Sequence, residues 1–426
     1  MNIRIRSGRV IDPAQDLDAV SDLWVEDGTV AGIGRKPRGF KAAREIDAQG
    51  LVVCPGLIEI SAHLREPGAE HKATIASELA AAASGGFTAV CATPDTDPVV
   101  DTPAVVELIH QRARGVRGAR VHCIGALTRE LEGEILAEMQ ALKDIGCVAV
   151  SNANNPVRDT SVLKSALAYA STLNLTVVLQ PADPWLSAKG VMHEGAQSTR
   201  LGLPGIPAAA ELIGLTRDLM LIAATGVKAH FHTLSTGAAV PYITSARADG
   251  LAVTADVGLA HLCLTDSAVS NYSGAANVQP PLRSQRDRQQ LVAALKRGDI
   301  DALSAHHQPQ DADAKAAPFA AAAPGISGFD TFIPLLLDVV RRGRVPLSRA
   351  LAACTQAPAA ALGLQGGTLV KGERADICIF DPSHEWILNT ATAFSCGLNT
   401  PFFGHTLHGR VTHTLVGGRV VYELER

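Results

Sequence analysis

The sequence predicts an α/β protein, in which a (β/α)8 barrel of the TIM type is combined with a small β domain. Three observations predict this. Short apolar runs of strand length alternate with helical patterns through the middle of the chain. Both ends of the chain consist of strand-like segments separated by turns. The length of 426 residues suits one large domain and a smaller one.

The barrel is expected over residues 54–365. Its strands are expected near residues 57–60, 87–92, 121–125, 147–151, 175–179, 227–231, 252–257 and 301–304. About eight strands, each followed by a helix, within roughly three hundred residues are typical of a (β/α)8 barrel. A doubly wound open sheet is the alternative. No Gly-x-Gly-x-x-Gly motif follows the first strand, so the dinucleotide-binding form of that fold has no support.

Helix signals fall between these strands. A helix is expected over residues 102–115, because Thr102 is a suitable N-cap and proline follows at the first helical position. A second helix is expected over residues 135–146, where Ile135, Met139 and Leu142 share one face.

The small domain is expected to be a composite β-sandwich of residues 1–53 and 366–426. Apolar and charged residues alternate at the N-terminus, and Asp27-Gly28 is a hairpin signal. Strand-like segments return at residues 376–381 and 416–421.

Composition excludes several classes of function. A net charge of −4 leaves no basic footprint for nucleic acid. No apolar run reaches the roughly eighteen residues that a membrane span needs, and the N-terminus lacks the apolar stretch of a signal peptide. The eight cysteines form no Cys-x-x-Cys pair. We therefore expect a cytoplasmic protein with buried free thiols.

Residues 54–68 contain the first candidate for a metal site. An apolar run after Pro-Gly leads into a histidine and a charged cluster, as at the end of a barrel strand that holds a metal. A His-x-His pair at positions 61 and 63 would place two imidazoles on one face of the strand. Position 61 is Ser61, so only His63 remains, and a hydroxyl is a poor zinc ligand.

Several segments, in order along nearly the whole chain, resemble the dihydroorotases of the amidohydrolase superfamily. They are residues 55–58, 63–68, 85–91, 280–283, 308–315, 323–328, 399–402 and 407–411. The resemblance implies a (β/α)8 barrel with a small composite β domain. It also implies zinc chemistry at the C-terminal mouth of the barrel, which opens the dihydroorotate ring or closes carbamoyl aspartate.

The positions that bind metal or perform acid–base chemistry in that family are altered here. They fall on Ser61, His63, Asn152, Gln180, Thr233 and His306. Only His63 keeps the residue of the family, and no carboxylate remains in the set. The resemblance therefore implies no catalytic residues and no metal. We expect the neutral side chains to fill the old cavity without leaving clustered charges buried.

The substrate-binding positions are altered in part. The arginine that clamps a carboxylate in the family is retained as Arg65, whereas two asparagines are replaced by Asp95 and Gln279. A charge on Asp95 would oppose an anionic substrate. Arg65 could alternatively form an internal ion pair with Glu66.

Two losses affect the same chemical step. Without zinc, the attacking water keeps a pKa near ~15.7 instead of ~7. Without the catalytic aspartate, no general base accepts its proton, which typically removes about 10²- to 10⁴-fold in rate.

The leading hypothesis is a catalytically inactive dihydroorotase-like protein without a cofactor. The resemblance implies that such a chain assembles with the aspartate carbamoyltransferase catalytic subunit of pyrimidine biosynthesis, as a homo-oligomer within a larger complex. The alternative is an active amidohydrolase acting on a cyclic amide or ureide such as dihydroorotate. One zinc would then be held by His63, His306 and His307, with Asp95 as base. A weaker third hypothesis is a ligand sensor that binds through Arg65.

A further histidine, His232, directly precedes the altered position Thr233. In regular strand geometry a shift of one residue turns the side chain to the opposite face. His232 is therefore not expected to replace the lost ligand simply, although a bulge at the strand end would reorient it.

Overall fold

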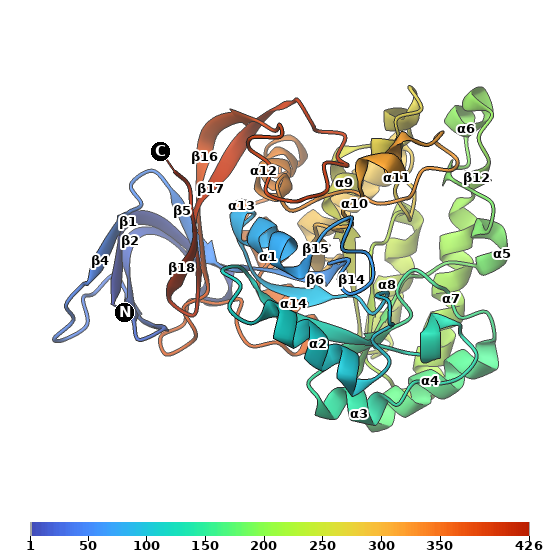
Figure 1. The fold of residues 1–426 in the computed structure, drawn as a ribbon, viewed down its shortest axis with the longest axis horizontal. Coiled ribbons are helices and arrows are strands. Elements are labelled where there is room, and N and C mark those ends of the chain that lie inside the picture. The colour runs from blue at the N-terminus through green and yellow to red at the C-terminus, as the bar shows by residue number, and fades with distance from the viewer. Residues whose placement is uncertain (1, 426) are drawn as a thin grey trace.

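The computed structural model describes residues 2–425 and has two parts (Figure 1). A barrel of parallel strands surrounded by helices occupies the middle of the chain. A sheet built from both ends of the chain lies beside it, so blue N-terminal and red C-terminal strands are neighbours in Figure 1.

The barrel consists of eight parallel strands, which confirms the predicted fold. In chain order they are β6 (Leu57–Ala62), β7 (Phe87–Ala92), β8 (Arg120–Ala126), β9 (Ala149–Ser151), β10 (Thr176–Leu179), β13 (Ala229–Phe231), β14 (Val253–Gly258) and β15 (Ala302–Ser304). Each predicted strand overlaps one of these. Nearly every residue in them is buried, because helices cover the outside and side chains fill the inside.

The first and last strands of the barrel are joined at their C-terminal ends. The backbone N–H of His63, just after β6, donates to the carbonyl of His307, just after β15, at 3.0 Å. Inside the barrel, the hydroxyl of Ser304 donates to the carboxylate of Glu59 at 2.5 Å. The residues that follow these strands therefore meet at one mouth.

The helices on the barrel follow its strands in turn. The longer ones are α1 (Ile75–Ser84), α2 (Pro103–Ala113), α4 (Thr160–Thr172), α7 (Ala208–Thr225), α8 (Val240–Ala248), α10 (Gln285–Arg297) and α12 (Phe332–Gly343). The shorter ones are α3 (Met139–Asp144), α5 (Pro184–Ser187), α6 (Ala196–Leu201), α9 (Leu259–Cys263), α11 (Ala312–Ala316), α13 (Leu347–Ala352) and α14 (Gln356–Leu362).

The two predicted helices have different outcomes. The helix expected over 102–115 is α2, with Thr102 as its N-cap and Pro103 in its first turn. The helix expected over 135–146 is shorter than predicted, because α3 begins only at Met139. Ile135 lies before α3 and is 61% exposed, since it belongs to the loop that follows β8.

The second sheet joins strands from both ends of the chain. It contains β1 (Ile3–Asp12), β2 (Leu17–Glu26), β3 (Thr29–Ile33), β4 (Arg44–Asp47), β5 (Val52–Pro55), β16 (Ile377–Ile387), β17 (Thr406–Val416) and β18 (Arg419–Glu423). All eight are hydrogen-bonded into one branched sheet, in which β4 and β5 both pair with β1. The strands of the expected composite β domain thus form one continuous sheet. A third, minor sheet pairs β11 (Met192–His193) with β12 (Gly205–Ile206).

The cysteines are free thiols, as predicted, but two of the eight are not buried. Cys396 is exposed and Cys263 is half-buried. Among residues 2–425, no helix combines the length and apolar character that a membrane crossing requires.

Candidate metal site and active site

A buried cluster of two histidines and one aspartate lies at the mouth of the barrel. His230 is in β13, His232 follows the end of that strand, and Asp256 is in the neighbouring strand β14. Asp256 Oδ2 lies 2.8 Å from His230 Nε2 and 2.7 Å from His232 Nδ1. One ligand atom from each residue falls within 4.8 Å of the other two.

The charges in this cluster stabilise one another. Burial favours the neutral form of Asp256, but His232 and His230 hold the pKa of this carboxyl well below its usual range. Burial also disfavours a charged His232, and the adjacent Asp256 outweighs this and raises the pKa of His232. The carboxylate therefore acts as a shared acceptor for both imidazoles.

Strand alternation places His230 and His232, two residues apart, on the same side of the strand, and both imidazoles contact Asp256 Oδ2. The following residue, Thr233, lies beyond the end of β13 at Phe231 and has a left-handed backbone with φ of 54°. Its N–H donates to Asp256 Oδ1 at 2.7 Å. Position 233 is therefore outside regular strand geometry, so the alternation that was expected to turn His232 away from position 233 does not apply, and the ring of His232 faces Asp256.

Two further histidines lie against this cluster. The ring of His306 packs edge-on against His232, with centroids 5.5 Å apart, and lies 6.0 Å from the ring of His261. The Nδ1 atoms of His306 and His261 are both buried without a hydrogen-bond partner. Burial, followed by the nearby His232, lowers the pKa of His306, so this imidazole is neutral.

His63 and Asp95 form a second pair at the mouth. His63 Nδ1 lies 2.6 Å from Asp95 Oδ2, and Thr93 Oγ1 donates to the other oxygen at 2.5 Å. Burial opposes ionisation of Asp95, but His63 outweighs this effect and holds the pKa of the carboxyl below its usual range. Asp95 is therefore ionised and its oxygens accept from protein donors.

The third acid at the mouth is Glu59, inside the barrel. Its Oε1 accepts from Ser304 Oγ and from the N–H of Ser61, and its Oε2 accepts from the N–H of Ala305. Burial raises the pKa of Glu59 to about 7.

The altered family positions now have structural hydrogen bonds. Asn152 accepts from Thr128 Oγ1 at 2.7 Å and donates from Nδ2 to the carbonyls of Leu131 and Asn155. Gln180 donates to the carbonyl of Gln279 at 3.3 Å. Asn152 makes more side-chain hydrogen bonds than Gln180, and all three of them go to residues of the surrounding loops.

Arg65 and Glu66 are adjacent in the sequence but contact different parts of the protein. Arg65 donates from Nε to the carbonyl of Pro309 at 2.9 Å. Glu66 accepts from the N–H of Ile75 and pairs with Arg112, so the internal ion pair considered for Arg65 and Glu66 is not formed.

Of the three histidines considered for one zinc, only two have rings at the mouth. His307 Nε2 lies 2.7 Å from Glu78 Oε2, and its Nδ1 accepts from the N–H of Gly328. Its ring stacks on Phe329 at 3.8 Å. Both nitrogens of His307 are therefore engaged away from His63 and His306.

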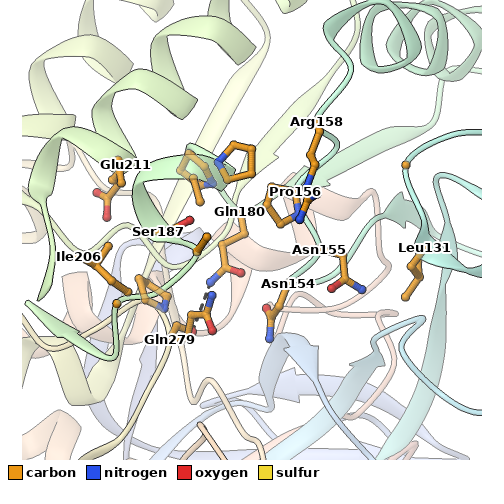
Figure 2. Close-up of a pocket in the computed structure, with 18 of the residues that line it drawn as sticks. Leu131, Asn154, Asn155, Pro156, Arg158, Gln180, Ser187, Ile206, Glu211 and Gln279 are labelled. Atoms are coloured by element: carbon orange, nitrogen blue, oxygen red, sulfur yellow. Dashed lines mark hydrogen bonds between the residues drawn. The ribbon is translucent and has the colours of Figure 1, made fainter. Parts of the chain in front are cut away.

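A cavity of about 890 Å³ is lined by residues of the loop after β9, of α5 and of the segment 279–283 (Figure 2). Gln180 and Gln279 lie on one side of it, and Asn154 and Asn155 project from the loop after β9. None of the three residues of the His-His-Asp cluster lines it. The amides can both donate and accept hydrogen bonds, and charged side chains, among them Glu211 and Arg283, line other parts of the cavity.

Comparison with known proteins identifies the family. A family model described as "Dihydro-orotase-like" matches residues 50–238, and one described as "Amidohydrolase family" matches residues 223–422. A dihydroorotase-like protein of Pseudomonas aeruginosa is 47% identical over 99% of this chain and 100% of its own length. The chain belongs to the dihydroorotase-like family of amidohydrolases. A dihydroorotase of Anaeromyxobacter dehalogenans is 44% identical over 99% of this chain and 98% of its own length.

Solved structures support the fold of this dihydroorotase-like chain. L-hydantoinase (dihydropyrimidinase) from Arthrobacter aurescens superposes with a TM-score of 0.86 at 23% identity, covering 100% of this chain and 96% of the other. Dihydropyrimidinase from Brevibacillus agri NCHU1002 gives 0.85 at 22% identity, covering 99% and 95%. At this identity the likeness concerns the barrel architecture.

These findings overturn the prediction that the chain has no cofactor. Amidohydrolases normally bind metal, and His230, His232 and Asp256 could hold an ion. Two imidazoles and one carboxylate are a donor set that zinc accepts in proteins. The residues therefore fit a divalent metal, which when bound would lower the pKa of a coordinated water.

The sequence contains a signal for this site. A His-x-His pattern is absent at positions 61 and 63 but present at His230 and His232. Asp256 sits in the next predicted strand, and neighbouring parallel strands bring their carboxyl ends to the same mouth.

Proposed function

We propose that this dihydroorotase-like chain does not catalyse the hydrolase reaction of its family and instead assembles with the aspartate carbamoyltransferase catalytic subunit of pyrimidine biosynthesis. We infer the loss of catalysis from the hydrogen bonds that the three acids at the mouth make with protein donors. Both oxygens of Glu59, Asp95 and Asp256 accept hydrogen bonds from protein donors. A general base must instead reach the proton of a substrate or water directly.

The replaced positions support the same proposal. The family's catalytic aspartate falls on His306, whose pKa is lowered by burial, so its imidazole is a weak base. The family's metal-bridging aspartate falls on Asn152, whose amide holds three structural hydrogen bonds. Restoring one of these groups would leave the other absent.

The partner follows from the family resemblance. Homologues of dihydroorotase without activity are known in the family as partners of aspartate carbamoyltransferase. A barrel that keeps its strands, helices and buried core while its reactive positions change is suited to a structural role, because assembly depends on the surface and not on the mouth.

Co-purification tests the assembly. The full chain, co-expressed with the carbamoyltransferase subunit of the same organism, is expected to elute with it as one large complex. Carbamoyltransferase expressed alone is the control. Separate elution of the two chains over a range of salt concentrations would refute the partnership.

A direct assay tests the loss of catalysis. The purified chain, supplied with zinc, is expected to show no hydrolysis of dihydroorotate and no cyclisation of carbamoyl aspartate above the buffer rate. Zinc-dependent turnover that disappears in Asp256→Asn would overturn this part of the proposal, even if the complex forms.

The second candidate function is a mononuclear metal-dependent amidohydrolase acting on a cyclic amide or ureide such as dihydroorotate. The His-His-Asp cluster favours it, together with a cavity that Gln180 and Gln279 help to line. The two functions are separated by turnover and not by metal content, because a metal held by His230, His232 and Asp256 is compatible with a structural role as well.

A further inference from the structure

The loop between β3 and β4, which we call the basic loop, has four positive side chains and no acidic one. It comprises residues 34–43, and its cations are Arg35, Lys36, Arg38 and Lys41. All four are exposed. The whole chain carries a net charge of −4 and the loop carries +4, so the rest of the chain carries −8. The basic loop is therefore a positive patch on a protein that is otherwise negative.

The arginines of the neighbouring strand β1 are paired within the molecule. Arg4 pairs with Asp22 at 2.9 Å and with Glu45 at 3.2 Å, and Arg6 pairs with Asp47 at 2.7 Å. Among residues 2–425, by contrast, the four side chains of the basic loop form no ion pair and no hydrogen bond. The acids of the adjacent strands are thus occupied by β1, and the loop cations are left for an anion from outside.

A second arginine-rich segment, residues 112–120, shows that this is not the rule for the chain. Three of its four arginines bind partners in the protein, which are the carboxylates of Glu66 and Asp376 and the carbonyl of Val420. Those cations serve the fold, whereas the cations of the basic loop do not.

The backbone of the basic loop is fixed although its cations are free. Phe40 is 2% exposed and packs edge-on against Trp24, with ring centroids 5.1 Å apart. The N–H of Phe40 donates to the carbonyl of Pro37 at 3.2 Å, and the N–H of Gly34 donates to the carbonyl of Asp22 at 2.8 Å. Binding of a ligand therefore does not have to order the backbone, which favours affinity.

The positive charges of the loop reinforce one another. Three of them fall within residues 35–38, so their Cα atoms are at most about 11 Å apart. This is close to the Debye length of about 8 Å at physiological salt, so their fields overlap. Trp24, against which the loop packs, has its indole N–H buried without an acceptor. This corner of the small sheet therefore has an excess of donors.

The surroundings of the loop favour a short acidic segment over other anions. Nucleic acid carries one charge per about 1.7 Å and would extend beyond the loop, over a protein of the same sign of charge. The aromatic residues at the loop, Trp24 and Phe40, are 5% and 2% exposed, so neither can stack on a base or insert into a bilayer. A few carboxylates on an extended peptide match the size and the charge of the patch.

We propose that the basic loop binds an acidic segment of a partner protein. The guanidinium forks of Arg35 and Arg38 take carboxylates, and the two lysines add charge. Strand β4, which follows the loop, lies at the opposite end of the molecule from α5 (Figure 1), and α5 lines the cavity described above. The proposal is therefore independent of whether the mouth is catalytic and of whether the carbamoyltransferase binds.

Fluorescence anisotropy of a labelled hexaglutamate peptide, titrated with the full chain, tests the site. The loop variant Arg35→Gln/Lys36→Gln/Arg38→Gln/Lys41→Gln is expected to weaken peptide binding by about 10-fold or more, because four attractions are lost. The matched control removes four exposed cations that already have acidic partners, in Arg129→Gln/Arg297→Gln/Arg341→Gln/Arg342→Gln. It lowers the net charge equally and is expected to keep the affinity within about twofold. Urea midpoints of both variants verify that they are folded.

The forks and the class of ligand are tested separately. Arg35→Lys/Arg38→Lys keeps the charge and is expected to weaken binding by about threefold, because lysine lacks the bidentate fork; an affinity equal to that of the wild type would overturn the role of the forks. No binding of hexaglutamate by the wild type, or equal weakening in the loop variant and the control, would overturn the site. Tighter loop-dependent binding of hexathymidylate, or of phosphatidylserine vesicles, than of hexaglutamate would overturn the protein partner.

Discussion

The carboxylate of Asp256 accepts a hydrogen bond from His230 across two neighbouring strands, with Oδ2 and Nε2 2.8 Å apart although the residues are 26 positions apart in sequence. Both side chains have no exposed surface. A buried carboxylate needs compensation by charge and hydrogen bonds. His232 provides a second donor to the same oxygen, so the cluster is stable as a hydrogen-bonded group and also presents the donor set of a metal site.

We predict that the wild-type chain binds about one zinc ion and that His232→Asn weakens this binding by about 100-fold or more, because one of three ligands is lost. Binding should also weaken as the pH falls, since a metal requires unprotonated imidazoles. Equilibrium dialysis followed by elemental analysis measures both effects. His261→Asn, at the mouth but outside the cluster, should retain the ion. Equal loss in both variants, or no zinc in the wild type, would contradict the assignment.

We predict that Asn152→Asp destabilises the chain by about 2 kcal/mol or more. The substitution restores an acid of the family, but it removes the donor that now serves the carbonyls of Leu131 and Asn155. A buried carboxylate facing two carbonyls loses hydrogen bonds and gains repulsion. Urea unfolding measures the free energy. Asn154→Asp, two residues along in the cavity wall, is the matched control and should change stability little. A neutral result at position 152 would show that this loop is not held by the amide.

We predict that Glu78→Gln lowers the free energy of unfolding by about 3 kcal/mol at pH 7. Glu78 pairs with His307 and accepts from Ser395 and the N–H of Cys396. It thereby joins α1 to the end of β15 and to the segment before β17. Glu107→Gln, exposed on α2, is the control and should leave the unfolding midpoint unchanged.

The pH dependence of this difference follows from the pKa of Glu78. Burial opposes ionisation, but His307 and the hydrogen bonds lower the pKa of Glu78 in the folded state below its ordinary value of 4.5. The stabilisation is therefore complete above pH 4.5 and is lost as the pH falls further. The wild type and Glu78→Gln should converge in acid, and a constant difference down to low pH would contradict an ionised Glu78.

We predict the opposite pH dependence for Glu59. Burial raises its pKa from 4.5 to about 7, so the folded chain binds more protons than the unfolded chain between these values. Stability should then fall as the pH rises through this window, by up to about 3 kcal/mol. Glu59→Gln should lack this slope. Unfolding curves of both proteins at several pH values measure the difference, and parallel curves would show that Glu59 is ionised throughout.

Sequence periodicity was sufficient for the barrel because its strands are buried on both faces. All eight apolar runs correspond to strands, since continuous burial requires apolar residues at every position. The helix expected over 135–146 was only partly correct. Ile135 fits the helical pattern, but it lies in the loop after β8 and is exposed, because loop contacts outweigh weak local periodicity.

The site was less accessible to sequence reasoning for a specific geometric reason. Alternation counted from position 233 turned His232 away from the mouth, but β13 ends at Phe231 and the left-handed backbone of Thr233 breaks the alternation at that position. The engagement of His307 with Glu78 could not be read from its position beside His306, since its partner is 229 residues away.

By itself, the sequence determined the parallel barrel and the strand character of both chain ends, and it predicted that the family's reactive residues are replaced. These depend on local pattern and on residue identity. Only the tertiary structure decided that His230, His232 and Asp256 meet as one buried group and that the acids at the mouth are already engaged. Such contacts depend on how strand ends and turns direct side chains across the barrel, and this direction is set by packing among residues distant in the chain.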